Sequence, residues 1–157
     1  MKLASTKIIT ACALVLLTNG AIAEPAKSEK HAKKANHLRH AVFTMLSANM
    51  GPLGGMAKGK VPFDAKIVEK NATRINQLSY MIDDFTRTDT RAYKVKTDAL
   101  PEVWTKRKAF EKRINDLSLA SAKLVKVSTS GDKAAIKAAI GGVGKTCGGC
   151  HDDFKKD

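Results

Sequence analysis

The chain has 157 residues, a length at which one domain can bury a substantial hydrophobic core. Lysine and arginine number 28 against 15 aspartate and glutamate residues, which gives a formal net charge of +13. A surface this basic attracts anionic partners such as acidic proteins or membrane surfaces. Because the lysines are spread along every segment with helical spacing, we interpret them as the solvated polar faces of helices.

Residues 1–23 have the pattern of a secretory signal peptide. Lys2 and Lys7 accompany an apolar run at residues 8–17, and the Ala-Ile-Ala segment at 21–23 has the small side chains of a cleavage site. The apolar run is too short to span a membrane, so we expect no stable membrane insertion. The sequence therefore predicts export, with cleavage after Ala23.

Cleavage at this point leaves residues 24–157 as a single domain. Its formal charge is +11, because two lysines depart with the signal peptide, and its only cysteines are Cys147 and Cys150. We expect this domain in the periplasm, and this location argues against nucleic acid as a partner.

Apolar residues follow helical spacing from about Ala35 to Met50, which predicts a first helix. The charged, alanine-rich segment before it, residues 24–34, is expected to be a frayed lead-in. The Gly-Pro-Leu-Gly-Gly segment at 51–55 is expected to interrupt or bend the helix, because proline and glycine both weaken helical structure. A loop at residues 59–62 follows.

Three more helices are expected after this loop. Asp64 is placed to cap the second helix, whose apolar stripe extends to Phe85, and residues 86–100 form a long polar connection. Pro101 opens the third helix, where the first turn tolerates proline, and Asp132 lies near the start of the fourth. Apolar positions of the third helix repeat every seven residues, as in helical bundles, at Val103, Phe110, Leu117 and Leu124. No segment shows convincing strand alternation.

A Cys-x-x-Cys-His motif occupies residues 147–151 of the fourth helix, and this motif is the attachment signature of a c-type haem. Two thiols form thioethers with the haem vinyl groups, and the adjacent imidazole coordinates the iron. Residues three and four apart lie on one helical face, so Cys147, Cys150 and His151 are expected to point at one flat group. We predict one covalent haem c per chain, with His151 as the axial ligand of the iron.

Three other chemistries use a Cys-x-x-Cys pair. A thioredoxin-like redox pair follows a strand, whereas this pair follows a helical pattern near the end of the chain. A zinc site needs further ligands and usually a second cysteine pair, which the mature chain lacks. A disulfide across two intervening residues would close only a tiny loop. The motif therefore favours haem over each of them.

Four amphipathic helices in one short chain predict an all-α fold, an antiparallel up-down four-helix bundle with covalently bound haem c in its core. The glycines between residues 141 and 149 allow two interpretations. Each weakens a helix by about 1 kcal/mol relative to alanine, so the helix can end near Gly141. Alternatively, small residues let a porphyrin lie close to the backbone, and we favour this second interpretation.

The mature chain resembles cytochrome c′, the class II c-type cytochrome family of bacterial periplasms. The resemblance includes Arg39 in the first helix, the Met-Ala-Lys-Gly-Lys-Val-Pro-Phe-Asp segment at 56–64, the Leu-Pro-Glu-Val-Trp segment at 100–104, and the haem motif near the C-terminus. Placement of the motif at this end is typical of the family. Cytochrome c′ is known as an up-down bundle.

The resemblance implies roles for individual residues. Arg39 corresponds to an arginine at a haem propionate, and Phe43 to the residue that stands over the open face of the iron. His40 follows Arg39 where the family places another polar residue near the haem, and Asp98 corresponds loosely to a haem-edge position. Lys155 departs from the family pattern, because the best-known members have an arginine there; it keeps the positive charge but lacks the planar fork.

Phe43 cannot donate an electron pair to iron, so we expect a five-coordinate, high-spin haem. The resemblance implies binding of small neutral gases such as NO and CO, electron transfer with redox partner proteins, and a homodimer formed through the first two helices. The alternative is a six-coordinate, low-spin electron-transfer cytochrome with a methionine or histidine as sixth ligand. The inferred distal face lacks a histidine or arginine poised for acid–base catalysis, so an enzyme is not expected.

Overall fold

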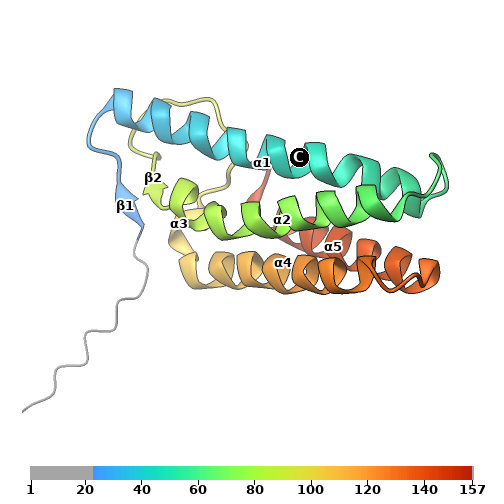
Figure 1. Cartoon of the computed structure of the whole chain (residues 1–157). Coiled ribbons are helices and arrows are strands. Elements are labelled where there is room, and N and C mark those ends of the chain that lie inside the picture. The colour runs from blue at the N-terminus through green and yellow to red at the C-terminus, as the bar shows by residue number, and fades with distance from the viewer. Residues whose placement is uncertain (1–22, 157) are drawn as a thin grey trace, which may run out of the picture.

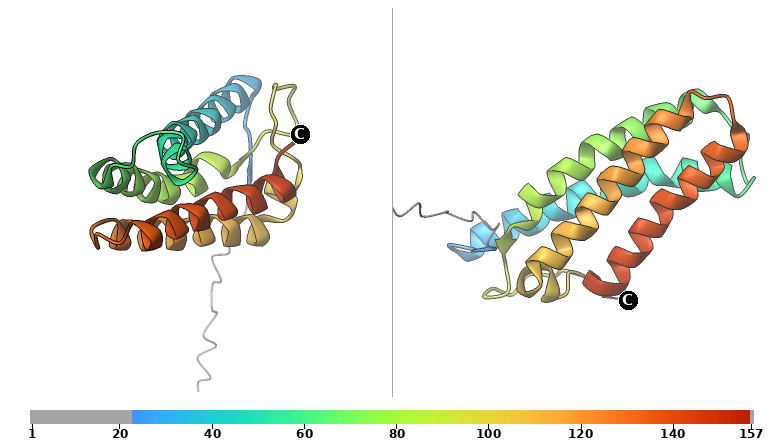
Figure 2. Two further views of the ribbon diagram at one scale, coloured as in Figure 1. Left: turned by 90° about the vertical axis from the view of Figure 1, so that its right-hand side faces the viewer. Right: turned by 90° about the horizontal axis from the view of Figure 1, so that it is seen from below.

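The computed structural model describes residues 23–156, and the predicted signal peptide at 1–23 lies outside this range apart from Ala23. Four long helices, α1 (Glu29–Ala57), α2 (Ala65–Thr86), α4 (Arg107–Ser128) and α5 (Lys133–Phe154), form an antiparallel bundle (Figure 1). Neighbouring pairs are α1 with α2, α2 with α4, α4 with α5, and α5 with α1 (Figure 2). The predicted up-down four-helix bundle is confirmed. None of the helices in the described range is long and apolar enough to cross a membrane.

Helix α1 begins earlier and ends later than the sequence predicted. Ser28 caps its first turn by accepting a hydrogen bond from the backbone of His31 at 3.1 Å, so the lead-in is already helical from Glu29. The predicted interruption at residues 51–55 is wrong, because α1 continues through Pro52 to Ala57. Pro52 is exposed at the surface, while Leu53 and Met56 are buried in the core on the other side. Their burial outweighs the local cost of proline.

Two predicted helix starts are confirmed by their caps. Asp64 accepts hydrogen bonds from the backbone of Lys66 at 2.8 Å and of Ile67 at 3.2 Å. Asp132 does the same for two amides of α5, at 2.9 and 3.0 Å. A carboxylate in this position satisfies amides that have no partner inside the helix, so each cap determines where its helix begins.

The predicted third helix is divided in two. A single turn, α3 (Glu102–Thr105), follows Pro101, and Lys106 then leaves the helical region with φ −114° and ψ 44° before α4 begins. Two strands of two residues each, β1 (Glu24–Pro25) and β2 (Thr88–Asp89), pair in parallel beside this end of the bundle. Strands of two residues are too short to produce an alternation of apolar and polar residues, so they could not be expected from the sequence.

Helix α5 runs through all five glycines to Phe154, so the interpretation in which it ends near Gly141 is wrong. Ile136, Ile140 and Val143 are buried along its inner face, and this burial outweighs a cost of about 1 kcal/mol per glycine. A side chain at Gly149 would meet the guanidinium of Arg113 at 3.3 Å, so this glycine permits a close approach between α4 and α5.

Small polar side chains join α2 to α4. Ser79 and Ser118 share a hydrogen bond of 2.8 Å, and the Asn76 amide donates to the Ser118 carbonyl at 3.0 Å and to the Ser121 hydroxyl at 3.1 Å. All three serines are buried. Their small size lets these two helices pack closely, while the seam between α1 and α5 stays open.

Candidate haem site

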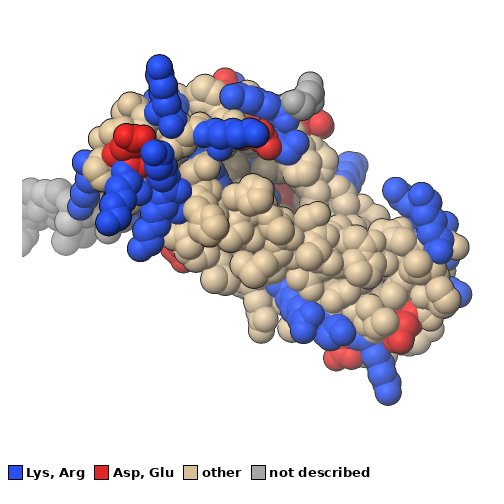
Figure 3. Space-filling view, turned by 90° about the horizontal axis from the view of Figure 1, so that it is seen from above, with Lys and Arg blue, Asp and Glu red and all other residues tan. Residues whose placement is uncertain are grey.

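A cavity of about 600 Å³ opens between α1 and α5 at the end of the bundle that carries the C-terminus. Figure 3 shows a hollow on this side of the molecule, with Lys and Arg side chains gathered around it. The lining comes from every long helix and from the connection before α3. Its residues are Asn36, Arg39, His40, Phe43, Thr44, Ser47, Thr86, Lys96, Thr97, Asp98, Ala99, Val103, Phe110, Cys150, His151, Phe154 and Lys155.

The structure brings together nearly all the residues that the sequence singled out. Cys150 and His151 line the cavity from α5, Arg39, His40 and Phe43 line it from α1, and Asp98 lines it from the connection. Cys147 is not part of the lining. It lies one turn before Cys150 on the same helix, is half-buried and packs against the hydrophobic core. Residues far apart in the sequence thus meet around one space.

The environment of the two thiols does not resemble that of a reactive redox pair. Burial raises the pKa of the Cys147 thiol. Burial, together with the neighbouring Cys147, raises the pKa of the Cys150 thiol to about 11. Reactive cysteines have lowered pKa values, because the thiolate is the nucleophile. The structure therefore argues against a thiol–disulfide enzyme, whereas thioether formation needs only that both sulfurs face one group.

Arg39 is a buried cation, only 4% exposed, in the cavity wall. Its Nη2 donates to Asn36 Oδ1 at 2.8 Å and to Thr97 Oγ1 at 3.1 Å. Its Nη1 is buried and has no hydrogen-bond partner within residues 23–156. Burial lowers the pKa of the guanidinium, and the nearby Asp89 opposes this effect. A buried donor without an acceptor is costly, so this site favours an anionic group.

Residues 96–100, which we call the strap, close one end of the cavity. The strap is joined to the C-terminal segment by the bonds Lys156 N to Asp98 O, 2.8 Å, and Leu100 N to Phe154 O, 3.0 Å. It is joined to α1 by the Asn36 amide, which donates to the Lys96 carbonyl at 3.0 Å. The predicted long connection is therefore an ordered wall of the site.

The α1 wall is more polar than the sequence analysis expected. His40 and Phe43 are joined in the lining by Thr44 and Ser47, and the Thr44 hydroxyl lies 3.5 Å from His40 Nδ1. Phe43 is 36% exposed, so its ring is not locked into the core. Thr44 and Ser47 were missed, although their spacing of one helical turn from His40 and Phe43 places them on the same face.

The opposite side of the cavity is partly aromatic. Phe110 and Phe154 pack edge to face, with ring centroids 5.0 Å apart, and both line the space. Lys155 also lines it, and its Nζ donates to the backbone carbonyl of Lys156 at 3.2 Å. The cavity thus has aromatic walls in one part and positively charged groups in another.

These residues fit a haem group. A haem has an apolar ring and two carboxylates, and the cavity offers aromatic surface together with a buried guanidinium that has a free donor. Cys150 and His151 reach the cavity from consecutive positions, as covalent attachment and axial ligation require. A cavity of about 600 Å³ lies within the usual range for cofactor sites.

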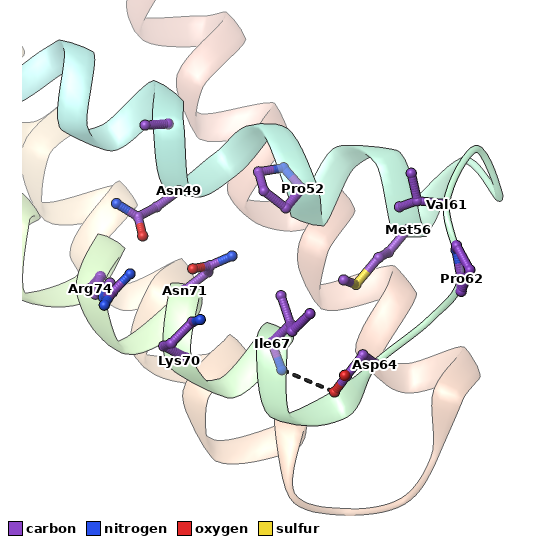
Figure 4. A pocket seen from close by; sticks show the side chains of 11 residues that line it. Asn49, Pro52, Met56, Val61, Pro62, Asp64, Ile67, Lys70, Asn71 and Arg74 are labelled. Carbon is purple, nitrogen blue, oxygen red and sulfur yellow. Dashed lines mark hydrogen bonds between the residues drawn. The ribbon is translucent and has the colours of Figure 1, made fainter.

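A second hollow, of about 620 Å³, lies between the C-terminal half of α1 and the first half of α2 (Figure 4). Pro52, Met56, Val61 and Ile67 contribute apolar surface, and Asn71 and Arg74 contribute polar groups. It contains none of the haem-motif residues, so it is separate from the candidate haem site.

A four-helix bundle with a Cys-x-x-Cys-His motif on its last helix, facing a cavity of this chemistry, defines the class of c-type cytochromes with a bundle fold. The family model described as Cytochrome C' matches residues 34–155. The chain belongs to the cytochrome c′ family, whose members carry covalently bound haem c.

Individual proteins agree with this assignment. The chain is 35% identical over 119 residues to cytochrome c' of Rubrivivax gelatinosus, covering 75% of this chain and 91% of the relative. The structure of cytochrome c prime from Shewanella frigidimarina is similar with a TM-score of 0.74 and 32% identity, covering 80% and 97% of the two chains. The nitric oxide complex of a mutant cytochrome c prime from Alcaligenes xylosoxidans is similar with a TM-score of 0.71 and 26% identity, covering 80% and 96%.

Proposed function

We propose that this protein is a periplasmic gas-binding cytochrome with a five-coordinate haem c. Cys147 and Cys150 hold the haem through thioethers, His151 is the single protein ligand of the iron, and Arg39 pairs with a propionate. The bound haem supplies an iron centre that can bind NO or CO and exchange an electron. The observation that carries the proposal is that no methionine lines the cavity within residues 23–156, and Phe43 lies on the α1 wall.

The α1 wall supports an open sixth position. Phe43 has no lone pair for iron, and its partial exposure leaves the ring room to move. Met45, the nearest methionine in sequence, is 44% exposed and does not line the cavity, so it is a poor candidate for a ligand. The similarity to a protein crystallised as its nitric oxide complex supports NO as one ligand.

Two alternative functions, a six-coordinate electron carrier and an enzyme, are distinguished from this proposal by the spectra described below. His40 lines the cavity and is the only histidine there besides His151, so a six-coordinate electron carrier would have to use it. An enzyme would use His40 or Arg39 for acid–base chemistry, but Arg39 is committed to Asn36 and Thr97. Both alternatives therefore depend on His40.

Absorption spectra of the purified ferric and ferrous protein, before and after addition of NO or CO, test the proposal. We expect broad high-spin bands and a clear change on adding gas. Sharp low-spin bands that do not respond would favour the electron carrier instead. In that case the variant His40→Ala shows whether His40 is the sixth ligand, because its removal would restore high-spin bands.

Phe43→Ala should speed CO binding, because the ring that covers the α1 side of the cavity is removed. Stopped-flow mixing of the ferrous protein with CO measures the rate, and we expect an increase of about tenfold or more, corresponding to about 1.4 kcal/mol or more in the barrier. Thr44→Ala, at the neighbouring lining position, is the matched control and should change the rate much less. An unchanged rate in Phe43→Ala would show that this ring is not the gate.

The groove of Figure 4 supports the homodimer that the family resemblance implies. Residues 41–57 of α1 contain no charged side chain. Val61 lines the groove and is exposed, and Met45 is exposed on α1, one turn before Asn49 of the lining. An uncharged helical face of this kind is suited to bind a second copy. We expect sedimentation equilibrium to give a dimer, and Met45→Lys to weaken it; Leu119→Lys, at an exposed apolar position on α4, is the control. A monomeric wild-type protein would contradict this proposal.

A further inference from the structure

The Arg39 guanidinium is fixed by contacts that haem binding alone does not explain. Its Nη2 donates to Asn36 Oδ1 at 2.8 Å and to Thr97 Oγ1 at 3.1 Å, while Thr90 Oγ1 lies farther away, at 3.5 Å. A guanidinium Nη carries two hydrogens, so the two shorter contacts use both of them. Nη2 therefore has nothing left to offer a ligand.

Trp104 contacts the same guanidinium through the face of its indole ring. The Arg39 Cζ lies 5.1 Å from the centroid of the Trp104 ring, within the range of a cation–π contact. The ring cannot turn freely, because its Nε1 donates to the carbonyls of Thr86 at 3.1 Å and Thr88 at 3.0 Å. Trp104 is itself buried. The Arg39 guanidinium thus lies over a ring that is held in place by two backbone carbonyls at the end of α2.

We infer that Asn36, Thr97 and Trp104, together the Arg39 clamp, are positioning residues that hold Nη2 of Arg39 and leave its Nη1 and Nε as the donors for a haem carboxylate. Nη1 is buried and without a partner in the described part of the chain, and Arg39 lines the cavity. The inference rests on the proposed function in one respect, namely that Arg39 faces a haem carboxylate.

The clamp also joins the haem site to the strap. Asn36 uses its other end to donate to the Lys96 carbonyl at 3.0 Å, and Thr97 Oγ1 accepts from the backbone of Ala99 at 3.2 Å. Asn36 and Thr97 therefore do two things: they hold the Arg39 guanidinium in place, and they hold residues 96–99 against α1. Loosening the clamp should affect both the electrostatics of the haem and the mobility of the strap.

The reduction potential of the haem measures the first effect. A donor fixed at a carboxylate offsets its negative charge, which otherwise favours the ferric state. Asn36→Ala and Thr97→Val should therefore lower the reduction potential of the haem. Thr97→Ser keeps the hydroxyl, so its potential should stay close to that of the wild type. Asn115→Ala, an exposed asparagine at a mid-helix position of α4, should leave it unchanged. Spectroelectrochemical titration gives each value.

Hydrogen exchange measures the second effect and does not depend on haem chemistry. Backbone amides at 96–100 should exchange about tenfold faster in Asn36→Ala, the factor expected for the loss of one to two hydrogen bonds. Amides in α2 and α4 should be unaffected. Faster exchange with an unchanged potential would mean that Asn36 only supports the strap, and the inference would be overturned.

A double-mutant cycle separates positioning from independent effects. In the background Arg39→Met, the clamp has nothing to orient, so adding Asn36→Ala should not lower the potential further. Full additivity would overturn the inference, because Asn36 would then act without Arg39. Trp104→Phe keeps an aromatic face and should shift the potential less than Trp104→Leu; should Trp104→Leu fail to fold, the cycle with Asn36 still decides.

The outcomes for this inference and for the proposed function are distinguishable. A low-spin or gas-insensitive wild-type protein contradicts the proposed function, yet the potentials of the clamp variants can still be measured. A gas-binding, high-spin protein whose potential is the same in Asn36→Ala and Thr97→Val contradicts the inference alone.

Discussion

Between α2 and α4 the bundle is closed by buried serines that share hydrogen bonds, whereas between α1 and α5 the same bundle holds a cavity of about 600 Å³. The closed seam uses side chains small enough for the helices to approach each other. The open seam has large aromatic, charged and thiol-bearing residues along its walls. The difference shows that one seam supplies the rigid half of the scaffold and the other supplies the site.

The largest effect is expected from emptying the open seam. Cys147→Ala combined with Cys150→Ala removes both thioether positions, so no haem should remain on a denaturing gel stained for haem. The variant should also be less stable than the wild type to urea, because the cavity loses the group that fills it. Cys12→Ala, in the predicted signal peptide, is the matched control and should retain the stain. A stained double variant would refute covalent attachment at this motif.

The next largest effect concerns the end of the closed seam, where Asp83 of α2 pairs with Arg107 of α4 and with Arg87. Arg107 is buried, so Asp83→Asn leaves a buried cation with Glu111 as its remaining carboxylate partner. We expect a loss of about 2–3 kcal/mol in the free energy of unfolding at neutral pH, measured by urea titration.

This loss should depend on pH. Burial opposes ionisation of Asp83, but hydrogen bonds from Arg87 and Arg107 outweigh it and hold its pKa below the ordinary value of 3.8. The ionised carboxylate thus stabilises the fold above pH 3.8, and the contribution is lost as pH falls through the lowered pKa. The difference between wild type and Asp83→Asn should therefore shrink as the pH falls below 3.8. A difference that is constant with pH would contradict the assignment.

The smallest effect is expected within the closed seam itself. Ser79→Ala removes a buried hydroxyl whose oxygen lies 2.6 Å from the Asn76 carbonyl oxygen and 2.8 Å from the Ser118 hydroxyl oxygen. Because Ser118 keeps its bond to the Ile114 carbonyl, we expect a cost of about 1 kcal/mol in unfolding free energy. The rate of CO binding should be unchanged; an altered rate would show that the two seams are coupled.

Much of the site was predictable because a helix converts spacing into a shared face. The motif at 147–151 predicted that Cys147, Cys150 and His151 would meet a flat group from one helix; Cys150 and His151 line the cavity, whereas Cys147 does not. Arg39 and Phe43, four residues apart on α1, were assigned from the family resemblance, and the structure places both in the same wall. Their roles toward the haem remain predictions.

Other contacts were not predictable, because they join residues far apart in the sequence. Thr97 meets Arg39 only because the strap folds back across α1, and residues 86–100 have no periodicity from which this path could be inferred. Asn36, by contrast, lies three residues before Arg39 on the same helix, so its contact with Arg39 is local. The contact of Trp104 with Arg39 also joins two distant parts of the chain. This contact depends on how the α3 turn packs against the rest of the bundle, which no local pattern specifies.

The sequence by itself determined the four amphipathic helices, the caps at Asp64 and Asp132, and the haem-attachment motif at residues 147–151, since all of these depend on near neighbours in the chain. Tertiary structure decided whether weak helical segments persist. Helix α1 passes Pro52, and α5 passes five glycines, because buried apolar side chains on their inner faces outweigh local propensity. Tertiary structure also decided which polar groups surround the cavity, because only the folded chain brings Thr97 and Trp104 to Arg39.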